Sequence, residues 1–255
     1  MGSKLRGQVI LNTRPAHQQS ELTALLEREG ARVLSFPVIE ILPAPARENP
    51  PDITQYDILL FVSRNAVDGA FDRFDAAQLA AVELLGVIGS ATHAALSERI
   101  EDVRATLIAS EPYNSEALLA AASLQQVAGK RILILRGQEG RNLLGDELAR
   151  RGAQVDYYEV YRRTLPATGA ADFERLVVAG LPTLVILTSN EGMHNLFALV
   201  DSAAAQALRR IPWLLISERM RESARKLGHN APVIIARSAS DQGIQQTICD
   251  WANHS

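Results

Sequence analysis

The stretches ILLFVSRNAVDGAF (residues 58–71) and LVILTSNEGMHNLF (residues 184–197) are two versions of one pattern. Each begins with an uninterrupted apolar run, continues with Ser and Asn, and ends with an amphipathic segment that closes on Phe. Uninterrupted apolar runs of this length are typical of strands that are buried on both faces, as in parallel sheets. The pattern therefore predicts a buried strand and a following helix, with polar side chains at the carboxyl end of the strand.

Similar apolar runs recur along the whole chain. They lie at residues 9–11, 58–61, 87–88, 132–135, 184–187, 214–216 and 233–235. Segments with helical periodicity lie between them, for example at residues 20–29 and 142–151, and Gly30 and Gly152 follow as stop signals. Strands that alternate with helices in this way indicate βαβ units and a parallel α/β sheet.

The chain is an imperfect duplication. Residues 7–39 align without a gap with residues 129–161, and the identical pairs include Gly7/Gly129, Ile10/Ile132, Arg14/Arg136, Leu26/Leu148 and Gly30/Gly152. Further along, Ser63 aligns with Ser189 and Gly89 aligns with Ser217. A repeat of about 125 residues is longer than the repeats of solenoid proteins, so two similar α/β lobes are expected.

The duplication also predicts where the chain passes from one lobe to the other. Strands expected at residues 32–42 and 154–164 end at equivalent points of the repeat, and proline or glycine breaks the pattern after each of them. We expect lobe 1 to comprise residues 1–36 and 166–255, and lobe 2 to comprise residues 42–160. Residues 37–41 and 161–165 would then link the two lobes.

The composition excludes several classes of protein. The 255 residues are 47% hydrophobic and 22% charged, with a formal net charge of −3, which does not suggest a nucleic-acid partner. No apolar run approaches the roughly 20 residues of a membrane span. The single Cys249 excludes an intrachain disulfide, and the scattered histidines lack the spacing of a metal site. A cytoplasmic protein without metal is expected.

The polar strand ends are the first candidate ligand site, because ligands of open parallel sheets bind at the carboxyl ends of strands. Ser63 and Asn65 follow one strand, and Thr188, Ser189 and Asn190 follow its copy. The simpler interpretation is that these residues only cap the next helix. The same polar end in both lobes favours a ligand, since helix N-termini with free N–H groups also bind anions.

Other strand ends add glycines and arginines. Gly89 and Thr92 open the helix after one strand, and Ser217 and Arg219 stand at the equivalent point of the second lobe. Arginines at strand ends can pair with carboxylates in bidentate fashion. The sequence around Gly137 resembles a phosphate loop only loosely and lacks the Lys-Ser/Thr pair of a nucleotide site. The remaining candidates for substrate binding are Arg14, Arg136, Gly137 and Arg141.

These residues leave three functional classes open. The first is an enzyme, although the sequence has neither a Ser/His/Asp set nor a nucleophile elbow. The second is a sensor or carrier with two lobes that closes on a small ligand without catalysis. The third, a nucleotide enzyme with a dinucleotide fold, lacks its glycine fingerprint.

The chain resembles the uroporphyrinogen-III synthase family over nearly its whole length. The resemblance rests on the order and spacing of VILNTRP (9–15), FPVIEI (36–41), SRNAV (63–67), IGSAT (88–92), SEALL (115–119), GKRILILRG (129–137), GRNLLGDELARRGAQV (140–155), EVY (159–161), TS (188–189) and ISERM (216–220). The SEALL motif adds Ser115 to the candidates for substrate binding.

The resemblance implies a fold and a reaction. The fold has two flavodoxin-like lobes, each a parallel sheet flanked by helices, and a pair of antiparallel strands that joins them around a cleft. The reaction closes the linear tetrapyrrole hydroxymethylbilane into uroporphyrinogen III, with inversion of ring D and loss of water. The family needs no cofactor and no metal. We also expect a monomer that receives its substrate by transient handover from the preceding enzyme of the pathway.

The resemblance further places a tyrosine near the hydroxyl group that leaves the substrate, and this position corresponds to Tyr161. A phenol has an ordinary pKa of about 10, so it is protonated at neutral pH and can donate. The reactive cation is delocalised by the pyrrole of the substrate, so the protein mainly has to position the chain. Tyr161 is therefore the expected catalytic residue.

Overall fold

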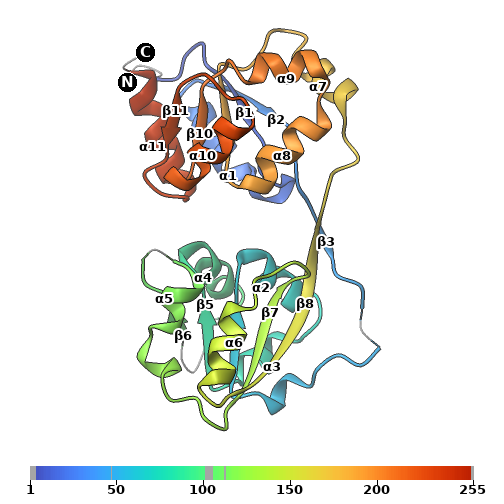
Figure 1. The fold of residues 1–255 in the computed structure, drawn as a ribbon, viewed down its shortest axis with the longest axis vertical. Helices are drawn as coiled ribbons and strands as arrows, with labels where there is room; N and C mark the ends of the chain where they lie inside the picture. Colours follow the sequence, from blue (N-terminus) through green and yellow to red (C-terminus); the bar gives the residue numbers. More distant parts are fainter. Residues whose placement is uncertain (1–3, 47, 101–105, 112, 254–255) are drawn as a thin grey trace. The chain divides into compact units, whose positions relative to one another are not determined.

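The computed structural model describes residues 4–46, 48–100, 106–111 and 113–253, and it divides into two compact units (Figure 1). Unit 1 comprises residues 1–40 and 164–255, and unit 2 comprises residues 41–163. Each unit has one sheet of mainly parallel strands with helices on both faces, which confirms the predicted α/β fold class.

Unit 1 has five parallel strands in the order β11-β10-β9-β1-β2. The strands are β1 (Val9–Asn12), β2 (Arg32–Ser35), β9 (Leu184–Leu187), β10 (Trp213–Leu215) and β11 (Val233–Ile235). The helices are α1 (Ser20–Arg28), α7 (Ala170–Leu176), α8 (Asn190–Leu199), α9 (Ser202–Leu208), α10 (Glu218–Lys226) and α11 (Asp241–Ala252). Numbered within the unit, this is the flavodoxin-like order 2-1-3-4-5.

Unit 2 has six strands in the order β3-β8-β7-β4-β5-β6. The strands are β3 (Glu40–Pro43), β4 (Ile58–Phe61), β5 (Leu84–Val87), β6 (Thr106–Ile108), β7 (Arg131–Gly137) and β8 (Gln154–Thr164). The helices are α2 (Arg64–Phe71), α3 (Ala76–Ala80), α4 (Ser90–Ser97), α5 (Ser115–Leu119) and α6 (Leu143–Arg150). Without β3, this sheet has the same order as that of unit 1, but its first two strands, β7 and β8, come last in the chain.

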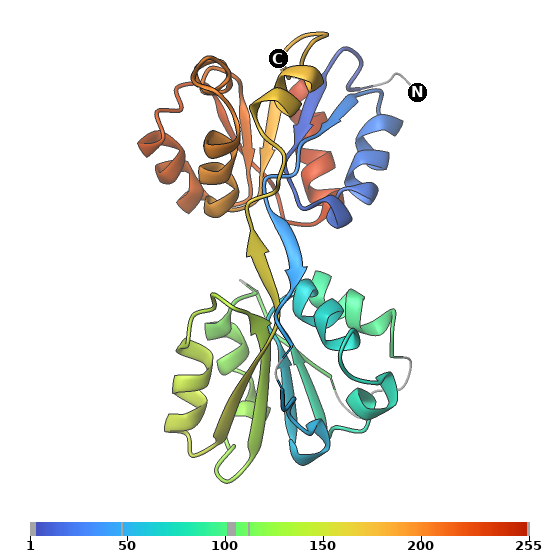
Figure 2. The same cartoon turned by 90° about the vertical axis from the view of Figure 1, so that its right-hand side faces the viewer.

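The chain crosses between the units twice, once at β3 and once at the end of β8. The two strands are neighbours in the sheet, and Figure 2 shows their arrows in opposite directions. The amide of Ala44 donates to the carbonyl of Val160 at 3.2 Å, and Thr164 Oγ1 donates to Glu40 Oε2 at 3.5 Å. The antiparallel pair of strands that the family resemblance implies is therefore present where the chain passes between the two units.

The strand expected at residues 32–42 is not continuous, unlike its counterpart β8. It divides into β2 and β3, because Pro37 in the interval lacks the N–H group that a ladder requires. The amides on either side of Pro37 turn back to β1: Phe36 donates to the carbonyl of Asn12 at 3.0 Å, and Val38 donates to that of Thr13 at 3.2 Å.

The cores follow from the alternation of side chains along the strands. In β4, Leu59 and Phe61 belong to the cluster under α2 and α4, whereas Ile58 and Leu60 belong to the cluster under α5 and α6. All four side chains are buried, which is why this strand reads as an uninterrupted apolar run. Polar side chains at this strand are consequently confined to its end.

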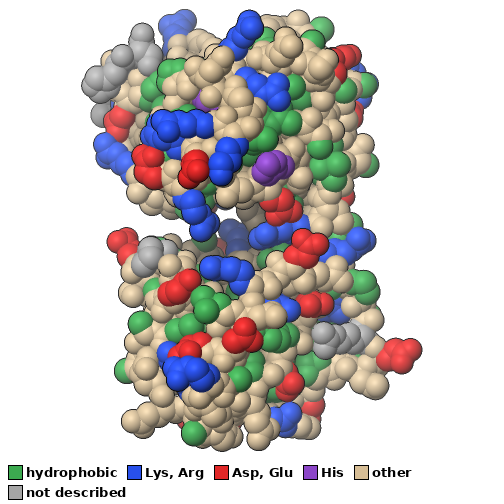
Figure 3. Space-filling view, viewed as in Figure 1, with side chains coloured by type: hydrophobic (Ala, Val, Ile, Leu, Met, Phe, Trp, Pro, Cys, Tyr) green, Lys and Arg blue, Asp and Glu red, His purple; other side chains and the backbone are tan. Residues whose placement is uncertain are grey.

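Charges on the surface are mixed. Figure 3 shows Lys and Arg side chains interspersed with Asp and Glu on the visible face, in keeping with the small net charge. Within the described ranges, no helix is long and apolar enough to cross a membrane.

A buried imidazole makes the stability of unit 1 depend on pH. His229 is 8% exposed, its ring lies 4.0 Å from that of Trp213, and its Nε2 lies 3.0 Å from the carbonyl oxygen of Ile211. Burial lowers the pKa of His229, although the hydrogen bond to Ile211 opposes this shift. Below its ordinary pKa of about 6.5, the unfolded chain therefore binds a proton that the folded chain does not bind.

We predict that the free energy of unfolding falls as the pH drops below about 6.5, with a slope of at most about 1.4 kcal/mol per pH unit for one proton. The stability is present above this pH and is lost as the pH falls toward the lowered pKa of the folded state. His229→Gln, which keeps a hydrogen-bond donor, should flatten the dependence. Urea unfolding followed by tryptophan fluorescence between pH 5 and pH 8 measures it, and an unchanged slope in the variant would contradict the assignment.

The order of strands predicts which fragments fold. Residues 41–163 hold the cores of unit 2 and its whole sheet apart from the first residue of β3 and the last residue of β8, so this fragment should unfold cooperatively in urea. Residues 1–125 lack β7 and β8 of unit 2 and β9, β10 and β11 of unit 1. That fragment should show no cooperative transition by circular dichroism, and a sharp transition would contradict the interleaved topology.

Candidate active site

Polar residues that the sequence analysis predicted as site residues lie at the carboxyl edge of the unit 2 sheet. Ser63 ends the turn after β4, and its Oγ accepts from the amide of Ala66 at 3.2 Å as the cap of α2. Asn65 is buried in the first turn of the same helix. Ser63 therefore has the capping role that the sequence suggested. Its hydroxyl also makes a second contact.

Tyr161 on β8 reaches Ser63 across the end of the intervening strand. Its hydroxyl oxygen accepts from Ser63 Oγ at 3.1 Å, and its side chain is buried, with the residue 5% exposed. The strand between them, β7, ends at Gly137, opposite Tyr161 in a register shifted by a bulge. A Cβ atom at Gly137 would lie 2.8 Å from two atoms of the phenol ring. The absent side chain of Gly137 therefore provides the space in which the phenol crosses β7.

The phenol keeps a hydrogen that it can donate. Ser63 Oγ accepts from the amide of Ala66 and gives its own hydrogen to the Tyr161 oxygen, so the hydrogen of the Tyr161 hydroxyl remains to donate. Ser63 is also more exposed than the buried Tyr161. The pair is therefore arranged as an inner phenol whose oxygen is held by the hydroxyl of a more exposed serine.

The turn after β5 and the first turn of α4 contain two of the predicted site residues, Gly89 and Thr92. Gly89 caps α4 with a φ of +86°, a left-handed conformation that disfavours residues with a Cβ atom. Thr92 is buried, and its Oγ1 donates to the carbonyl of Ile88 at 2.8 Å. Thr92 thus makes a structural hydrogen bond to the turn before α4. Gly89 has no side chain to cover the backbone of that turn.

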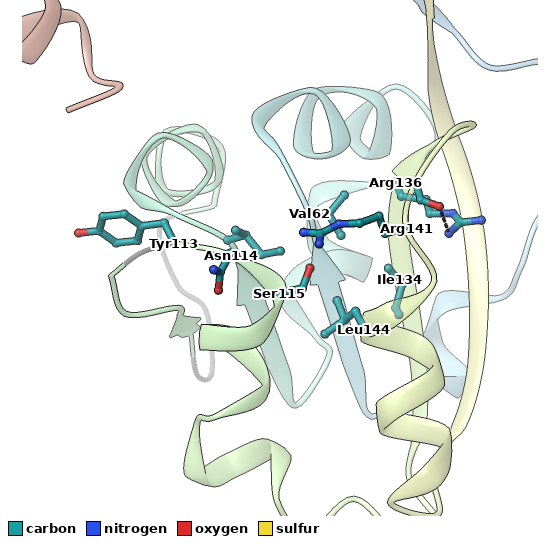
Figure 4. A pocket seen from close by; sticks show the side chains of 10 residues that line it. Val62, Tyr113, Asn114, Ser115, Ile134, Arg136, Arg141 and Leu144 are labelled. Atoms are coloured by element: carbon teal, nitrogen blue, oxygen red, sulfur yellow. Dashed lines mark hydrogen bonds between the residues drawn. The ribbon is translucent and has the colours of Figure 1, made fainter. Parts of the chain in front are cut away.

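A cavity of about 240 Å³ opens beside these turns (Figure 4). It is lined by Val62, Ile88, Tyr113, Asn114, Ser115, Ile134, Arg136, Gly140, Arg141 and Leu144. The residues come from the ends of β4 and β5, from β7 and the loop that follows it, from the start of α5 and from α6. Tyr113 has a φ of +52°, which is uncommon for a side chain of this size, and Figure 4 shows its ring directed away from the other lining residues.

The two arginines of the cavity differ in orientation. Figure 4 shows the Arg136 guanidinium turned toward β8 and the Arg141 side chain extending across the cavity. Arg136 lies 3.9 Å from the ring centroid of Tyr157, and its Nη2 lies 3.6 Å from Glu159 Oε1. Arg141 is 68% exposed, and its Nη1 lies 3.5 Å from Glu116 Oε1. Arg136 is a fixed part of the wall, whereas Arg141 is a loosely held cation.

Burial changes the electrostatics of the wall. It raises the pKa of Tyr157, and the positive charge of Arg136 opposes this rise. The Tyr157 hydroxyl donates to the carbonyl of Asn142 at 3.0 Å, and Arg136 Nη1 donates to Asn142 Oδ1 at 2.9 Å. These contacts hold the loop that carries Arg141 at the edge of the sheet. Arg136 Nε is buried without a hydrogen-bond partner within the described part of the chain.

The equivalent edge of unit 1 has the same caps but no phenol in the place of Tyr161. Ser189 Oγ accepts from the amide of Gly192 at 2.9 Å as the cap of α8, and Thr188 precedes it. Asn190 Oδ1 is buried, and no hydrogen-bond partner is recorded for it among the described residues. Ser217 stands at the N-cap of α10 without a side-chain hydrogen bond to the helix, and Arg219 is exposed in its first turn.

Arg14 does not project freely from the end of β1. It forms an ion pair with Asp241 at the start of α11, and the two side chains are 15% and 12% exposed. The sequence predicted a substrate contact for this arginine and gave no sign of the acid, which lies more than 200 positions away in the chain. A ligand carboxylate would have to compete with that acid.

The structure adds residues that the sequence analysis missed. Asn114 caps α5, with its Oδ1 accepting from the amide of Ala117 at 2.8 Å, and Glu116 faces Arg141. An Asn directly before SEALL is a recognisable N-cap signal, so Asn114 could have been found. In the described part of the chain, no group of three or more His, Cys, Asp or Glu residues could hold a metal ion.

Comparisons with known proteins identify the family of the chain. A family model described as "Uroporphyrinogen-III synthase HemD" matches residues 20–245. The chain is 36% identical over 230 residues to the uroporphyrinogen-III synthase of Salmonella typhimurium, which covers 86% of this chain and 91% of that protein. It is 32% identical over 224 residues to the enzyme of Escherichia coli, with the same coverage of 86% and 91%.

Solved structures share the fold at low sequence identity. The uroporphyrinogen-III synthetase of Helicobacter pylori superposes with a TM-score of 0.64 at 15% identity and covers 96% of this chain and 99% of that one. A mutant synthase of Thermus thermophilus gives a TM-score of 0.57 at 18% identity, with coverage of 97% and 99%. On the family model and the two bacterial relatives, this chain belongs to the uroporphyrinogen-III synthase family.

Proposed function

We propose that the chain closes hydroxymethylbilane into uroporphyrinogen III at the carboxyl edge of the unit 2 sheet, with Tyr161 and Ser63 as its proton path. The reaction itself is that of the family to which the chain belongs, which is an enzyme family of haem biosynthesis, so a binding protein without catalysis is not favoured. The observation that carries the assignment of the site is the hydrogen bond of 3.1 Å from Ser63 Oγ to the hydroxyl oxygen of Tyr161.

The first chemical step breaks the bond between carbon and the terminal hydroxyl of the substrate. The electron pair of the adjacent pyrrole stabilises the cation that forms, and the hydroxyl leaves as water once it has received a proton. Tyr161 can give its proton to the leaving oxygen, and the hydrogen bond that Ser63 donates to the phenol oxygen stabilises the phenolate that forms. This route uses the phenol as the donor and the serine hydroxyl as its support, which is general-acid assistance by positioned side chains.

The second task is to direct ring D to the correct carbon. The cation is attacked at a substituted position of ring D, and a bond of that ring must then migrate before the ring closes with inversion. The proton that ring D finally releases can restore the phenol, so the protein ends the cycle unchanged. Holding the chain for this sequence of steps is a matter of position and orientation, which can lower a barrier by several kcal/mol.

The eight carboxylates of the substrate require donors. In unit 2 the proposed contacts are Asn65, Gly89, Thr92, Ser115, Arg136, Gly137 and Arg141, in addition to Ser63. In unit 1 the proposed contacts are Arg14, Thr188, Ser189, Asn190, Ser217 and Arg219. Caps and first turns of helices present N–H groups suited to carboxylates, and arginines add charge-assisted hydrogen bonds. Of these residues, Arg14 and Arg136 are largely buried beside acidic partners, so they are weaker candidates than the exposed Arg141.

We further propose that the chain acts as a monomer in the cytoplasm and receives its unstable linear substrate directly from the enzyme that makes it. The family assignment supports a tetrapyrrole substrate. The monomer and the handover rest on the expectation from sequence alone.

Removal of the phenol hydroxyl tests the proton path. For Tyr161→Phe we expect turnover about tenfold slower, less than the roughly 10²–10⁴-fold of general-acid catalysis, because the pyrrole already drives departure. The ring remains packed, so the free energy of unfolding should change little. Incubation with enzymically generated hydroxymethylbilane, followed by separation of the type I and type III isomers, measures rate and product together.

The isomer ratio distinguishes two roles for Tyr161. If it only assists departure of water, the variant slows but its product remains type III. If it also positions ring D, the share of type I exceeds what the slower rate alone predicts. Wild-type rate together with a wild-type ratio would remove Tyr161 from the mechanism. Failure of the unmodified chain to form any type III isomer would overturn the proposed function as a whole.

The position of the phenol depends on Gly137. For Gly137→Ala we expect a loss of turnover similar to that of Tyr161→Phe, because the new Cβ would displace the ring. In the Tyr161→Phe background, the same substitution should cost little further activity, since the hydroxyl that it misplaces is already absent. Gly169→Ala is the matched control, as nothing lies within 4 Å of a Cβ atom there. Equal losses in both backgrounds would mean that Gly137 acts independently of the phenol.

A further inference from the structure

We propose that the cavity of unit 2 binds one carboxylate-bearing pyrrole ring of the substrate, and that Arg141 exchanges Glu116 for the carboxylate of that ring. The choice of a pyrrole carboxylate rests on the proposed function, whereas the exchange of partners by Arg141 rests on the geometry of the cavity. Glu116 would then hold the Arg141 guanidinium until a substrate carboxylate replaces it.

The walls of the cavity suit a flat apolar ring with a charged arm. Val62, Ile134 and Leu144 provide apolar surface, and Leu144 is a buried residue in the first turn of α6. A volume of about 240 Å³ lies below the roughly 300–1,000 Å³ of sites for whole drug-sized ligands. The cavity can therefore hold a fragment such as one ring with its side chains, and it cannot enclose a tetrapyrrole.

Arg141 is the cation that can change partners. Its distance of 3.5 Å from Glu116 is long for a charge-assisted hydrogen bond, and the two side chains are 68% and 52% exposed. Exposed ion pairs of this kind contribute little to stability, so the pair can separate at small cost. A carboxylate in the cavity could instead bind the planar guanidinium through two parallel hydrogen bonds.

Arg136 is not equivalent to Arg141 in this respect. Its side chain is 12% exposed, packs 3.9 Å from the ring centroid of Tyr157 and is tied to Glu159 and Asn142. Its charge adds to the positive potential of the wall, but its guanidinium is turned toward β8 (Figure 4). The exchange is therefore specific to Arg141.

The start of α5 supplies neutral donors beside the guanidinium. Ser115 contributes a hydroxyl to the lining, and Asn114 contributes an amide. The amide oxygen of Asn114 is used in the cap of α5, which leaves its NH₂ group as the donor. A guanidinium with a hydroxyl and an amide NH₂, in a cavity that is otherwise lined by apolar side chains, favours a carboxylate over a neutral ester of the same shape.

The test uses the full chain and a direct measure of binding. The probe is a monopyrrole with one acetate and one propionate side chain, and its dimethyl ester and succinate serve as comparison ligands. Amide chemical shifts of ¹⁵N-labelled protein are followed during titration, with Ser115, Gly140 and Leu144 as reporters within the cavity. Four variants are compared: Arg141→Met, Glu116→Gln, Arg150→Met and Glu83→Gln.

Two of the variants are matched controls within unit 2. Arg150 is 74% exposed and pairs with Glu147, so Arg150→Met removes an exposed, paired arginine that does not line the cavity. Glu83 is 66% exposed and pairs with Lys130, so Glu83→Gln removes an exposed, paired glutamate in the same way. Both controls should bind the probe as the unmodified chain does.

We expect the diacid to shift the cavity reporters at millimolar concentration and the diester and succinate to shift them much less. Arg141→Met should raise the Kd about tenfold, as loss of one charge-assisted contact implies. Glu116→Gln should lower the Kd about threefold, because Arg141 no longer has a competing acid. In turnover assays, Arg141→Met should raise KM for the tetrapyrrole more than it lowers kcat.

Several results would overturn the inference. They are equal binding of diacid and diester, shifts confined to residues outside the cavity, an unchanged Kd in Arg141→Met, or weaker binding in Glu116→Gln. Isomer analysis on the same preparation separates this inference from the proposed function. A chain that makes the type III isomer but whose cavity ignores the diacid refutes the inference alone, and a chain that binds the diacid but makes no type III isomer refutes the proposed function alone.

Discussion

The central strands of both sheets are buried on both faces, and this constraint determines where polar chemistry can be placed. In β4 the residues from Ile58 to Phe61 leave no polar position, and β9 repeats the pattern from Leu184 to Leu187. A polar side chain along these strands would need a hydrogen-bond partner within the core, at a cost of several kcal/mol if none were found. The hydroxyls therefore begin at the first turn beyond each strand, where they cap the next helix, and in unit 2 the cavity opens beside the same turns.

The same constraint explains why much of the fold could be predicted from the sequence. Uninterrupted apolar runs and the gapless internal alignment specify two parallel sheets, and serines after apolar runs specify Ser63 and Ser189 as caps. These signals are local or repeat at a fixed spacing. What could not be predicted depends on which strands become neighbours. The contact of Tyr161 with Ser63 needs β8, β7 and β4 in that order, together with a bulge and a glycine at the end of β7.

Pairing of charges was beyond prediction for the same reason. Arg14 and Arg136 occupy equivalent positions in the repeat, and both were expected to be available for a ligand. Each instead has an acid supplied by another element: Asp241 from the start of α11, and Glu159 from β8. Arg141, which lies in the loop between β7 and α6, has the most exposed side chain of the three arginines. Two copies of one sequence pattern have thus diverged through their partners.

The permuted order of unit 2 has a consequence for synthesis on the ribosome. Unit 2 is complete when residue 163 has emerged, whereas β1, β2 and α1 of unit 1 must wait for β9 to provide the next strand. At the usual roughly 5–20 residues per second, this wait lasts on the order of ten to thirty seconds. During that time the apolar faces of Ile10, Leu22 and Leu26 have no core to enter. We therefore expect chaperones that bind apolar segments to bind the nascent N-terminal segment, while the middle of the same chain is already folded.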